Sequence, residues 1–384
     1  MRITRILAHT TLALGVALAG LGNASAELPA DPGIGQTTLP FPPEPHRAYV
    51  IDVEFDNFVT GRVVVVDPEK KKVLGMVSTG FAAPSTLSRD GKYLYSADLF
   101  YSRGTRGTRT DVLTAWNTST LSPDWEVVIP SKRAEALTQR YSLGTSSDDR
   151  FVYVFNFTPS TSVTVVDIKA KAVATEIAIP GCVLSYPVGK RAFASLCGDG
   201  NLQLVTLNDE GKEIARSHTA FFDPNAEKLV ERAYAVGDTY YFVTTTGTVR
   251  GVDFSGKQPK LLPAWELVTD AADKKAGWAP GGWQLITVAP KLNRLYVLMH
   301  DAHEPMKWED PSPIVWVFDL KTRKRIATLE APNPIWSLNA TRDDNPLLLG
   351  TNIAGGLEVF DLKSGKHTGT MEGVHKTATQ VLSH

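Results

Sequence analysis

Short runs of β-branched and aromatic residues alternate with polar turns along most of this chain, and one pattern recurs. An apolar run ends in Asp or Asn, a polar turn follows, and a second apolar run begins. Seven copies end at Asp67, Asn117, Asp167, Asn208, Asp253, Asp319 and Asp361. β-Branched residues favour strands, and Asp or Asn side chains bond to the backbone of turns. Each copy therefore predicts a β-hairpin.

A second pattern lies between these copies, as a polar turn that leads into an aromatic or aliphatic run. The clearest examples are residues 88–95 (SRDGKYLY) and 147–153 (SDDRFVY), and weaker versions occur at 189–193, 237–241, 292–296 and 342–347. Two hairpins per repeat make a four-stranded antiparallel blade. The pattern therefore predicts an all-β fold, a seven-bladed β-propeller of four-stranded antiparallel blades.

The seventh copy of the second pattern is found near the N-terminus, at residues 45–51, instead of at the C-terminus. The last blade is therefore expected to be closed by N- and C-terminal strands, with residues 380–382 pairing beside residues 47–77. Such closure removes exposed sheet edges. It predicts one propeller domain over residues 45–384.

Two insertions exceed the length of a blade. One is 263–282, with a short helix expected over 265–275, and the other is 300–313. Long loops in compact domains usually carry function or lack order. These two segments are therefore places to look for a site.

The first 26 residues have the features of a cleaved signal peptide. Arg2 and Arg5 precede an apolar run at 12–19, and Ala24-Ser25-Ala26 forms a cleavage site. The run is shorter than the roughly 20 residues that span a bilayer, although an uncleaved membrane anchor is the alternative. We expect export to the periplasm. Residues 27–44 are Pro-rich and predict an extended arm that is either disordered or lies along a partner.

Charge excludes two classes of partner. The chain holds 40 Lys and Arg against 41 Asp and Glu, a formal charge of −1. Removal of the signal peptide, which has two arginines and no acid, makes the balance slightly more negative. Neither nucleic acid nor a membrane is an expected partner, because both would favour a basic surface.

The chain has two cysteines, Cys182 and Cys197. In an exported protein an even pair predicts a disulfide, and two buried thiols are the alternative. Two cysteines cannot form a Cys-rich zinc site.

Catalytic motifs are absent from the sequence. There is no G-x-S-x-G, no H-E-x-x-H and no P-loop, and the glycines at 104 and 107 follow no βαβ pattern. His300, Asp301, His303 and Glu304 could ligate a metal in principle, but a solvated loop is the favoured interpretation. We predict neither a metal site nor a catalytic residue in this chain.

Two groups of residues are candidates for a partner interface. Arg103, Arg106 and Arg109 form a basic run near Tyr101, and such arginines are either solvated or paired with a partner. A set of tryptophans gathers around the insertions, with most members expected in the core and one or two, Trp283 among them, at an interface: Trp278, Trp283, Trp308 and Trp316.

Several stretches together resemble the large subunit of the quinoprotein amine dehydrogenases, the methylamine and aromatic amine enzymes. They are RVVVVDPEKKKVLGMV (62–77), the 88–117 segment with its R-x-x-RG-x-R-[ST]-D loop, Cys182 to Gly200, and the 277–299 segment with its W-x-PGG-[WY] turn. The likeness covers nearly the whole mature chain. The aromatic amine branch is the closer of the two.

The resemblance implies a seven-bladed propeller with one disulfide and no cofactor of its own. It implies a small, disulfide-rich partner subunit in a two-plus-two heterotetramer. That subunit would carry tryptophan tryptophylquinone, formed from two of its own tryptophans, and the catalytic base. A primary amine would be oxidised to aldehyde and ammonia, and electrons would pass to a periplasmic cupredoxin of the azurin or amicyanin type.

The resemblance also implies that a Phe after the first strand gates the substrate channel. Phe55 fits best because it keeps its spacing to Asp52 and Arg62, and Phe58 is the alternative. Both could instead be ordinary core aromatics.

Two other functions remain open on the sequence. A free-standing periplasmic propeller that acts as a binding module would be a monomer. A metal-dependent propeller hydrolase would need acids, Asn or His facing the central channel, which the repeats do not display regularly.

Overall fold

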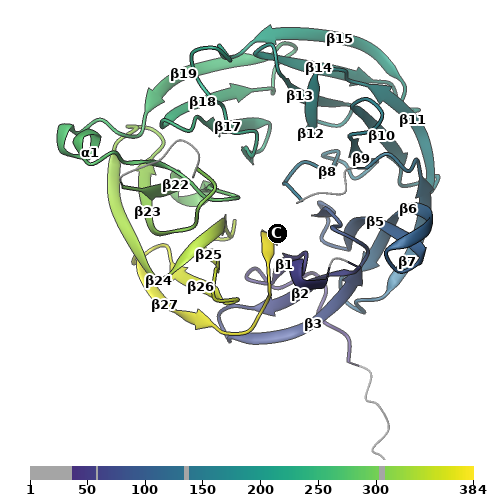
Figure 1. Ribbon diagram of the computed structural model, residues 1–384, viewed down its shortest axis with the longest axis horizontal. Helices are drawn as coiled ribbons and strands as arrows, with labels where there is room; N and C mark the ends of the chain where they lie inside the picture. The colour runs from purple at the N-terminus through teal and green to yellow at the C-terminus, as the bar shows by residue number, and fades with distance from the viewer. Residues whose placement is uncertain (1–36, 58, 134–137, 302–307) are drawn as a thin grey trace, which may run out of the picture. The chain divides into compact units, whose positions relative to one another are not determined.

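The strands of this protein are arranged radially around a central axis (Figure 1). The computed structural model describes residues 37–57, 59–133, 138–301 and 308–384. Contacts divide the chain into two units, Met1–Thr37 and Thr38–His384. The second unit contains all the described strands, and each four-stranded sheet in it runs from an inner strand near the axis to an outer strand.

Five sheets have four strands each. The first, in spatial order, consists of β28 (Ala378–Ser383), β1 (Ala48–Asp52), β2 (Gly61–Asp67) and β3 (Lys72–Thr79). The second consists of β4 (Ser85–Leu87), β5 (Tyr93–Arg103), β6 (Arg106–Asn117) and β7 (Pro123–Ile129). The third consists of β8 (Leu143–Thr145), β9 (Phe151–Asn156), β10 (Ser162–Asp167) and β11 (Ala172–Ala178). The fourth consists of β12 (Cys182–Val188), β13 (Ala192–Cys197), β14 (Asn201–Leu207) and β15 (Glu213–Ala220). The fifth consists of β16 (Tyr234–Val236), β17 (Thr239–Val243), β18 (Thr248–Asp253) and β19 (Lys260–Glu266).

The sixth sheet has eight strands. Its members are β20 (Ala279–Pro280), β21 (Ile286–Ala289), β22 (Arg294–His300), β23 (Ser312–Asp319), β24 (Arg325–Ala340), β25 (Leu347–Asn352), β26 (Leu357–Asp361) and β27 (Lys366–Met371). The all-β propeller is confirmed. The expectation of seven separate four-stranded blades is wrong, because the ring has five four-stranded blades and one larger sheet.

The larger sheet arises from β24, which is 16 residues long. Residues 325–330 pair with β23, and the last part of β24 pairs with β25 from Ile335. Ile335 itself lies opposite both Ser312 of β23 and Asn352 of β25. Pro332 and Pro334 lie between the two parts. Proline and the residue before it favour extended backbone, so the chain passes from one repeat to the next without leaving the strand. The hairpin repeat in the sequence gave no sign of this continuity.

Helical structure is sparse in the described residues. The helix expected over 265–275 is shorter, α1 (Ala271–Lys275), because β19 extends to Glu266. Asp270 caps α1 by accepting the backbone N–H groups of Ala272 and Asp273. Two 3₁₀ turns, η1 (Phe55–Asn57) and η2 (Pro290–Leu292), complete the elements.

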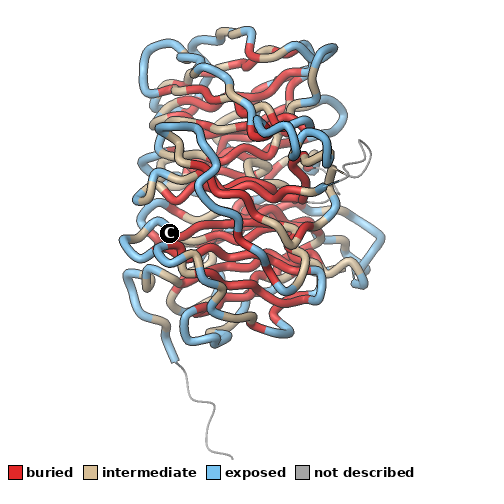
Figure 2. Tube along the Cα trace, turned by 90° about the vertical axis from the view of Figure 1, so that its left-hand side faces the viewer, coloured by how far each residue is buried: buried red, intermediate tan, exposed pale blue. Residues whose placement is uncertain are grey.

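Burial follows the order of strands within each sheet. In the third sheet, β9 and β10 are buried at every position, whereas β15 is largely exposed and β3 is exposed at half of its positions. Figure 2 shows the buried segments in the interior of the ring and the exposed ones at its surface. Strands covered on both faces have continuous apolar runs. The core therefore consists of apolar layers between neighbouring sheets rather than one central cluster.

The two ends of the described chain meet in the first sheet. β28 pairs with β1 in antiparallel register, from Ala48 opposite Ser383 to Asp52 opposite Ala378. This is the pairing that the sequence pattern predicts for the closing strands. It leaves β1 covered on both edges, since β2 pairs on its other side.

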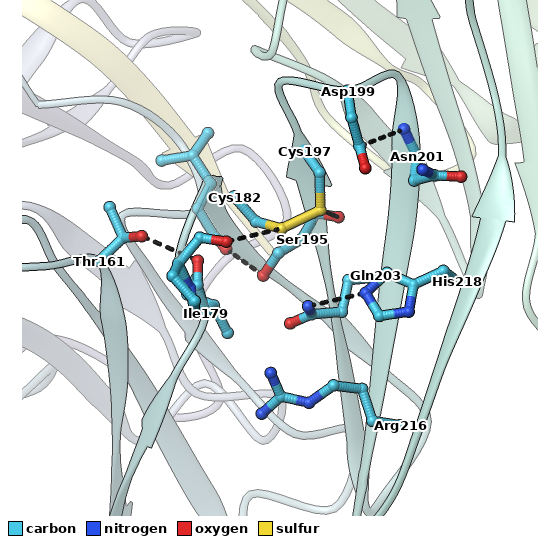
Figure 3. Close-up of a disulfide and its surroundings, with 12 residues drawn as sticks. Thr161, Ile179, Cys182, Ser195, Cys197, Asp199, Asn201, Gln203, Arg216 and His218 are labelled. Atoms are coloured by element: carbon cyan, nitrogen blue, oxygen red, sulfur yellow. Dashed lines mark hydrogen bonds between the residues drawn. A yellow bond between two sulfur atoms is a disulfide. The ribbon is translucent and has the colours of Figure 1, made fainter.

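Cys182 and Cys197 form the expected disulfide (Figure 3). The two residues lie opposite each other on β12 and β13, the inner pair of strands in the fourth sheet. The bridge therefore joins neighbouring strands within one sheet.

Candidate functional site

The described residues predicted as site residues lie at one face of the ring. Since strands within a sheet are antiparallel, the loop after each second strand and the connection to the next sheet lie at the same end. We call this end the site face, and it includes residues 53–57, 103–106, 138–142, 221–233 and 267–285. Inner turns such as 88–92 lie at the opposite end, which we call the turn face.

Phe55 lies in η1 at the site face and is partly buried. The preceding Asp52 is buried, and its carboxylate accepts hydrogen bonds from Arg62 Nε and Nη2 at 3.1 and 3.0 Å. Arg62 also lies 3.3 Å from the carboxylate of Glu54. These contacts fix the start of the loop that carries Phe55. Phe58 lies outside the described residues.

The three arginines of the basic run have different environments. Arg109 donates from Nε and Nη2 to the carboxylate of Asp111, each at 2.7 Å, and to the carbonyl of Arg133. Arg103 and Arg106 lie opposite each other at the tip of the β5–β6 hairpin, where both are exposed. Arg109 therefore stabilises the hairpin, and Arg103 and Arg106 present charge at the site face.

Trp283 is buried beneath the site face, at 5% exposure. The guanidinium of Arg232 lies 3.7 Å from the centroid of its ring and 4.8 Å from that of Trp308. Arg232 also forms an ion pair with Glu309, and Trp336 packs on Trp283 with ring centroids 5.3 Å apart. We call these five residues the Arg232 cluster.

The Arg232 cluster was not predicted as a unit. Its members come from the 221–233 connection, from the segment between β20 and β21, from the segment between β22 and β23, and from β24. A planar guanidinium stacks well on indole rings and keeps its charge at all relevant pH values. The grouping of tryptophans in the sequence was the available signal, but nothing in it pointed to Arg232 or Trp336.

A connection between sheets reaches the innermost strand at the site face. The carbonyl of Thr138 accepts the indole N–H of Trp283 at 2.9 Å, and its hydroxyl lies 2.7 Å from that of Thr379 in β28. Gln139 donates to the carboxylate of Glu231 at 2.7 Å. Residues 138 and 139 thus link the closing strand to the Arg232 cluster. No motif or periodicity in the sequence indicates this link.

An apolar groove opens at the site face between the third and fourth sheets. Most of its lining residues are apolar: Phe155, Phe157, Gly181, Val183, Leu184, Leu196, Cys197, Gly198, Phe222 and Leu229. Three polar residues complete the lining: Gln139, Ser142 and Glu231. Phe157 is 56% exposed. We call it the site-face groove. An exposed aromatic beside a hollow of this kind is typical of interaction surfaces.

One buried carboxyl supports the site face from below. Burial raises the pKa of Asp98, although hydrogen bonds from Ser96, Thr114 and the backbone N–H of Gly80 act to lower it. Its oxygen accepts that N–H at 2.8 Å. Asp98 therefore fixes the connection between β3 and β4, and its bonds to three groups of the chain are those of a structural residue.

The metal-like cluster of the sequence is only partly described. His300 ends β22 and Asp301 follows it, whereas His303 and Glu304 lie outside the described residues. In the part of the chain that the structure describes, no group of three or more His, Cys, Asp or Glu side chains could hold a metal ion. The same residues contain no helix long and apolar enough to span a membrane.

Fold and sequence together define the class of protein. The sequence model of the family described as methylamine dehydrogenase heavy chain matches residues 44–383. This chain belongs to that family, so the resemblance expected from the sequence is confirmed.

Individual heavy chains of methylamine dehydrogenase are similar over most of their length. The one from Methylobacillus flagellatus is 30% identical over 396 residues, which cover 100% of this chain and 98% of that protein. The one from Methylorubrum extorquens is 29% identical over 328 residues, which cover 85% of this chain and 79% of that protein. These relatives do not test the preference for the aromatic amine branch, which stays a prediction.

Solved structures support the fold alone. A putative 6-phosphogluconolactonase from Bacteroides fragilis superposes with a TM-score of 0.61 at 12% identity, covering 92% of this chain and 99% of that chain. A functionally unknown protein from Desulfotomaculum acetoxidans has a TM-score of 0.58 at 13% identity, covering 87% and 98%. At such identities the likeness carries no statement about activity.

Proposed function

We propose that this chain is the non-catalytic large subunit of a periplasmic quinoprotein amine dehydrogenase, which oxidises primary amines to aldehyde and ammonia. The observation that carries the proposal is the match to the heavy chain family over residues 44–383. The relatives are named heavy chains, which implies a light-chain partner. In our proposal the partner is a small subunit, and the two form a two-plus-two heterotetramer.

The site face is the proposed seat of the small subunit. It combines the exposed Phe157 of the site-face groove with Arg103 and Arg106 at the projecting hairpin. Aromatic residues and arginines dominate the energetics of protein interfaces, and a central apolar pocket with a charged rim is their usual arrangement. Trp283 would support this surface from beneath, since it is buried within the Arg232 cluster.

Phe55 is the residue we assign to the substrate channel. It follows the strand at which the ring closes, and the buried Asp52 anchors its loop. A partly buried aromatic side chain on an anchored loop can narrow a passage without blocking it. Phe55 would therefore act on the access of amine, while Phe58 remains the alternative.

The chemistry belongs to the partner in this proposal. Tryptophan tryptophylquinone on the small subunit would accept two electrons from the amine, and a cupredoxin of the azurin or amicyanin type would receive them. This chain would orient the small subunit and exclude water from the approach to the quinone. Residues 1–26 would direct export and be removed.

A pull-down tests the proposal. The full chain, tagged and expressed in its own source, would be isolated from periplasm and examined by intact mass. We expect a small chain to be recovered in equal amount with the wild type. Phe157→Glu should lower that recovery at least about tenfold, because a charge would be buried in the interface.

The matched control is Val128→Glu, which introduces the same charge on β7, a strand at the outer edge of its sheet, where Val128 is 70% exposed. Recovery of the small chain should be unchanged in this variant. If Phe157→Glu recovers as much of the small chain as the wild type does, the small subunit does not bind at the site-face groove. If the wild type recovers no small chain, the proposal is contradicted.

A further inference from the structure

A polar pocket lies between the inner strands of several sheets. It encloses about 860 Å³, its open mouth included. Its lining comes from inner strands, from the turns that follow them and from the two residues 140 and 141 ahead of β8: Ser85, Thr86, Leu87, Ser88, Arg89, Arg140, Tyr141, Leu143, Gly144, Thr145, Pro187, Ala235, Tyr240, Arg342, Leu382, Ser383 and His384. Most of this lining lies toward the turn face, and Arg140 and Tyr141 reach the pocket from the connection that leads from the site face into β8. We call it the channel pocket.

Three arginines from different parts of the chain line the channel pocket. Arg89 follows β4, Arg140 precedes β8, and Arg342 follows β24. The guanidinium carbons of Arg140 and Arg342 lie 4.8 and 5.9 Å from the centroid of one ring, that of Tyr234. Two guanidinium groups beside the same ring repel each other, and an anion between or beside them would offset this repulsion.

No carboxylate side chain of the described residues pairs with these arginines. The lining contains no Asp or Glu, and none of the three arginines forms an ion pair with a described residue. Elsewhere in the ring arginines are commonly paired, as Arg150 is with Asp167 at 2.6 Å and Arg216 is with Glu213 at 2.7 Å. The channel pocket thus departs from the pattern of the molecule.

The guanidinium of Arg140 is held in place but incompletely bonded. Its Nη2 donates to Asn339 Oδ1 at 3.2 Å and to the carbonyl of Val381 at 3.3 Å, whereas its Nε is buried and has no acceptor. A buried donor without an acceptor carries a free-energy cost, which an anion in the pocket would offset.

Two acids on the neighbouring turns accept backbone N–H groups. Asp149 accepts the backbone N–H groups of Arg89 and Asp90, and Asp238 accepts that of Gly189. The imidazole of His384 is kept neutral, since burial first and then Arg47 and Arg342 lower its pKa to about 4. The side chains that line the channel pocket therefore carry a net positive charge, from Arg89, Arg140 and Arg342.

We propose that the channel pocket binds a small oxyanion, either a carboxylate or a phosphate. Guanidinium groups donate two parallel N–H bonds to such groups, which a spherical chloride cannot accept in the same way. The environment of Tyr234 agrees with this. Burial acts to raise its pKa, yet Arg342 and Arg140 outweigh burial and hold the pKa below its ordinary value. The inference does not depend on the proposed function, because none of the residues proposed to contact the small subunit or the amine lines the channel pocket.

Calorimetric titration of the full chain with sodium phosphate and with sodium acetate tests the inference. Ionic strength is held constant with sodium chloride, so that general screening does not change. We expect saturable, one-site binding of at least one anion to the wild type. In Arg140→Gln/Arg342→Gln its affinity should fall at least about tenfold. The control is Lys190→Gln, which removes one exposed charge from the turn face outside the pocket and should bind as the wild type does.

Tighter binding of phosphate would assign a phosphoryl ligand, and tighter binding of acetate would assign a carboxylate ligand. Absence of saturable binding of both anions to the wild type would overturn the inference. Equal affinities of the wild type and the double variant would also overturn it. If the double variant does not fold, Arg342→Gln alone is judged by the same criterion, since Arg342 is exposed to solvent in the pocket.

Discussion

The carboxylate of Asp52 accepts the backbone N–H of Thr377 at 2.8 Å, across 325 residues of sequence. It accepts the N–H of Lys376 at the same distance, as well as two donors from Arg62. One buried side chain therefore joins the first strand, the loop that carries Phe55 and the connection into the closing strand. Closure of the ring and the position of the proposed gate depend on the same group.

Asp52→Asn should destabilise the protein by about 2 to 4 kcal/mol. The amide N–H₂ would face donors that now meet a carboxylate oxygen, and Arg62 would lose most of its counter-charge. Urea denaturation of the full chain measures the change. Asp56→Asn, an exposed position on the same loop, is the control and should leave the midpoint unchanged. Equal midpoints for both variants would show that Asp52 does not hold the closure.

Replacement of both cysteines by serine should lower stability by about 3 kcal/mol, the value of the chain-entropy model for a loop of this length. The bridge joins strands of one sheet, so its loss should leave assembly with the small subunit intact. Thermal unfolding and native mass measure the two effects. Complete loss of the assembly from a variant that is still folded would contradict this division.

Phe55→Ala should change the preference of the assembled enzyme between bulky and small primary amines. We expect the ratio of kcat/KM values for two such amines to shift roughly tenfold, the range typical of a change in pocket volume. Phe100→Ala, an exposed aromatic on the projecting hairpin, serves as the control. An amine series with the same ratios in the wild type and Phe55→Ala would reject Phe55 as the gate and favour Phe58.

Acid should weaken the larger sheet through Glu358, a side chain in β26 with no exposed surface. Burial acts to raise its pKa, but hydrogen bonds from Asn333, Thr370, Asn352 and His367 outweigh burial and hold the pKa below the ordinary 4.5. A lowered pKa in the folded state adds stability above pH 4.5, and that stability is lost as the pH falls through the folded-state pKa.

Urea midpoints of the wild type should therefore decrease as the pH falls below about 4.5, and Glu358→Gln should show a smaller decrease. Glu372→Gln changes an exposed carboxyl after β27 and should follow the wild type. If Glu358→Gln and the wild type lost stability in parallel, other carboxyls would account for the acid sensitivity.

The sequence predicts the strands well because each hairpin carries its own signal. The Asp at 319 and at 361 marks strand ends that the structure shows in β23 and β26. The sequence does not predict how far each sheet extends, because this depends on whether hydrogen bonds continue between repeats. Pro332 and Pro334 keep the chain extended there, and a residue type usually associated with breaks instead joins two repeats into one sheet.

The candidate site was less accessible to sequence reasoning. Phe55 and Trp283 could be named, but the face on which they lie follows only from the three-dimensional order of strands. Arg232 stacks on Trp283, 51 positions away, and Thr138 bonds the same indole from 145 positions away. Contacts at such separations leave no periodic or motif signal in one sequence.

The central claim is that this chain is a subunit of a quinone-bearing amine dehydrogenase. The most direct test is a visible spectrum of the native protein purified from its own source, recorded before and after addition of a primary amine. We predict a co-purifying small chain and a quinone absorption band that the amine bleaches. A colourless monomer whose spectrum does not respond to amines would contradict the account and leave only the propeller fold.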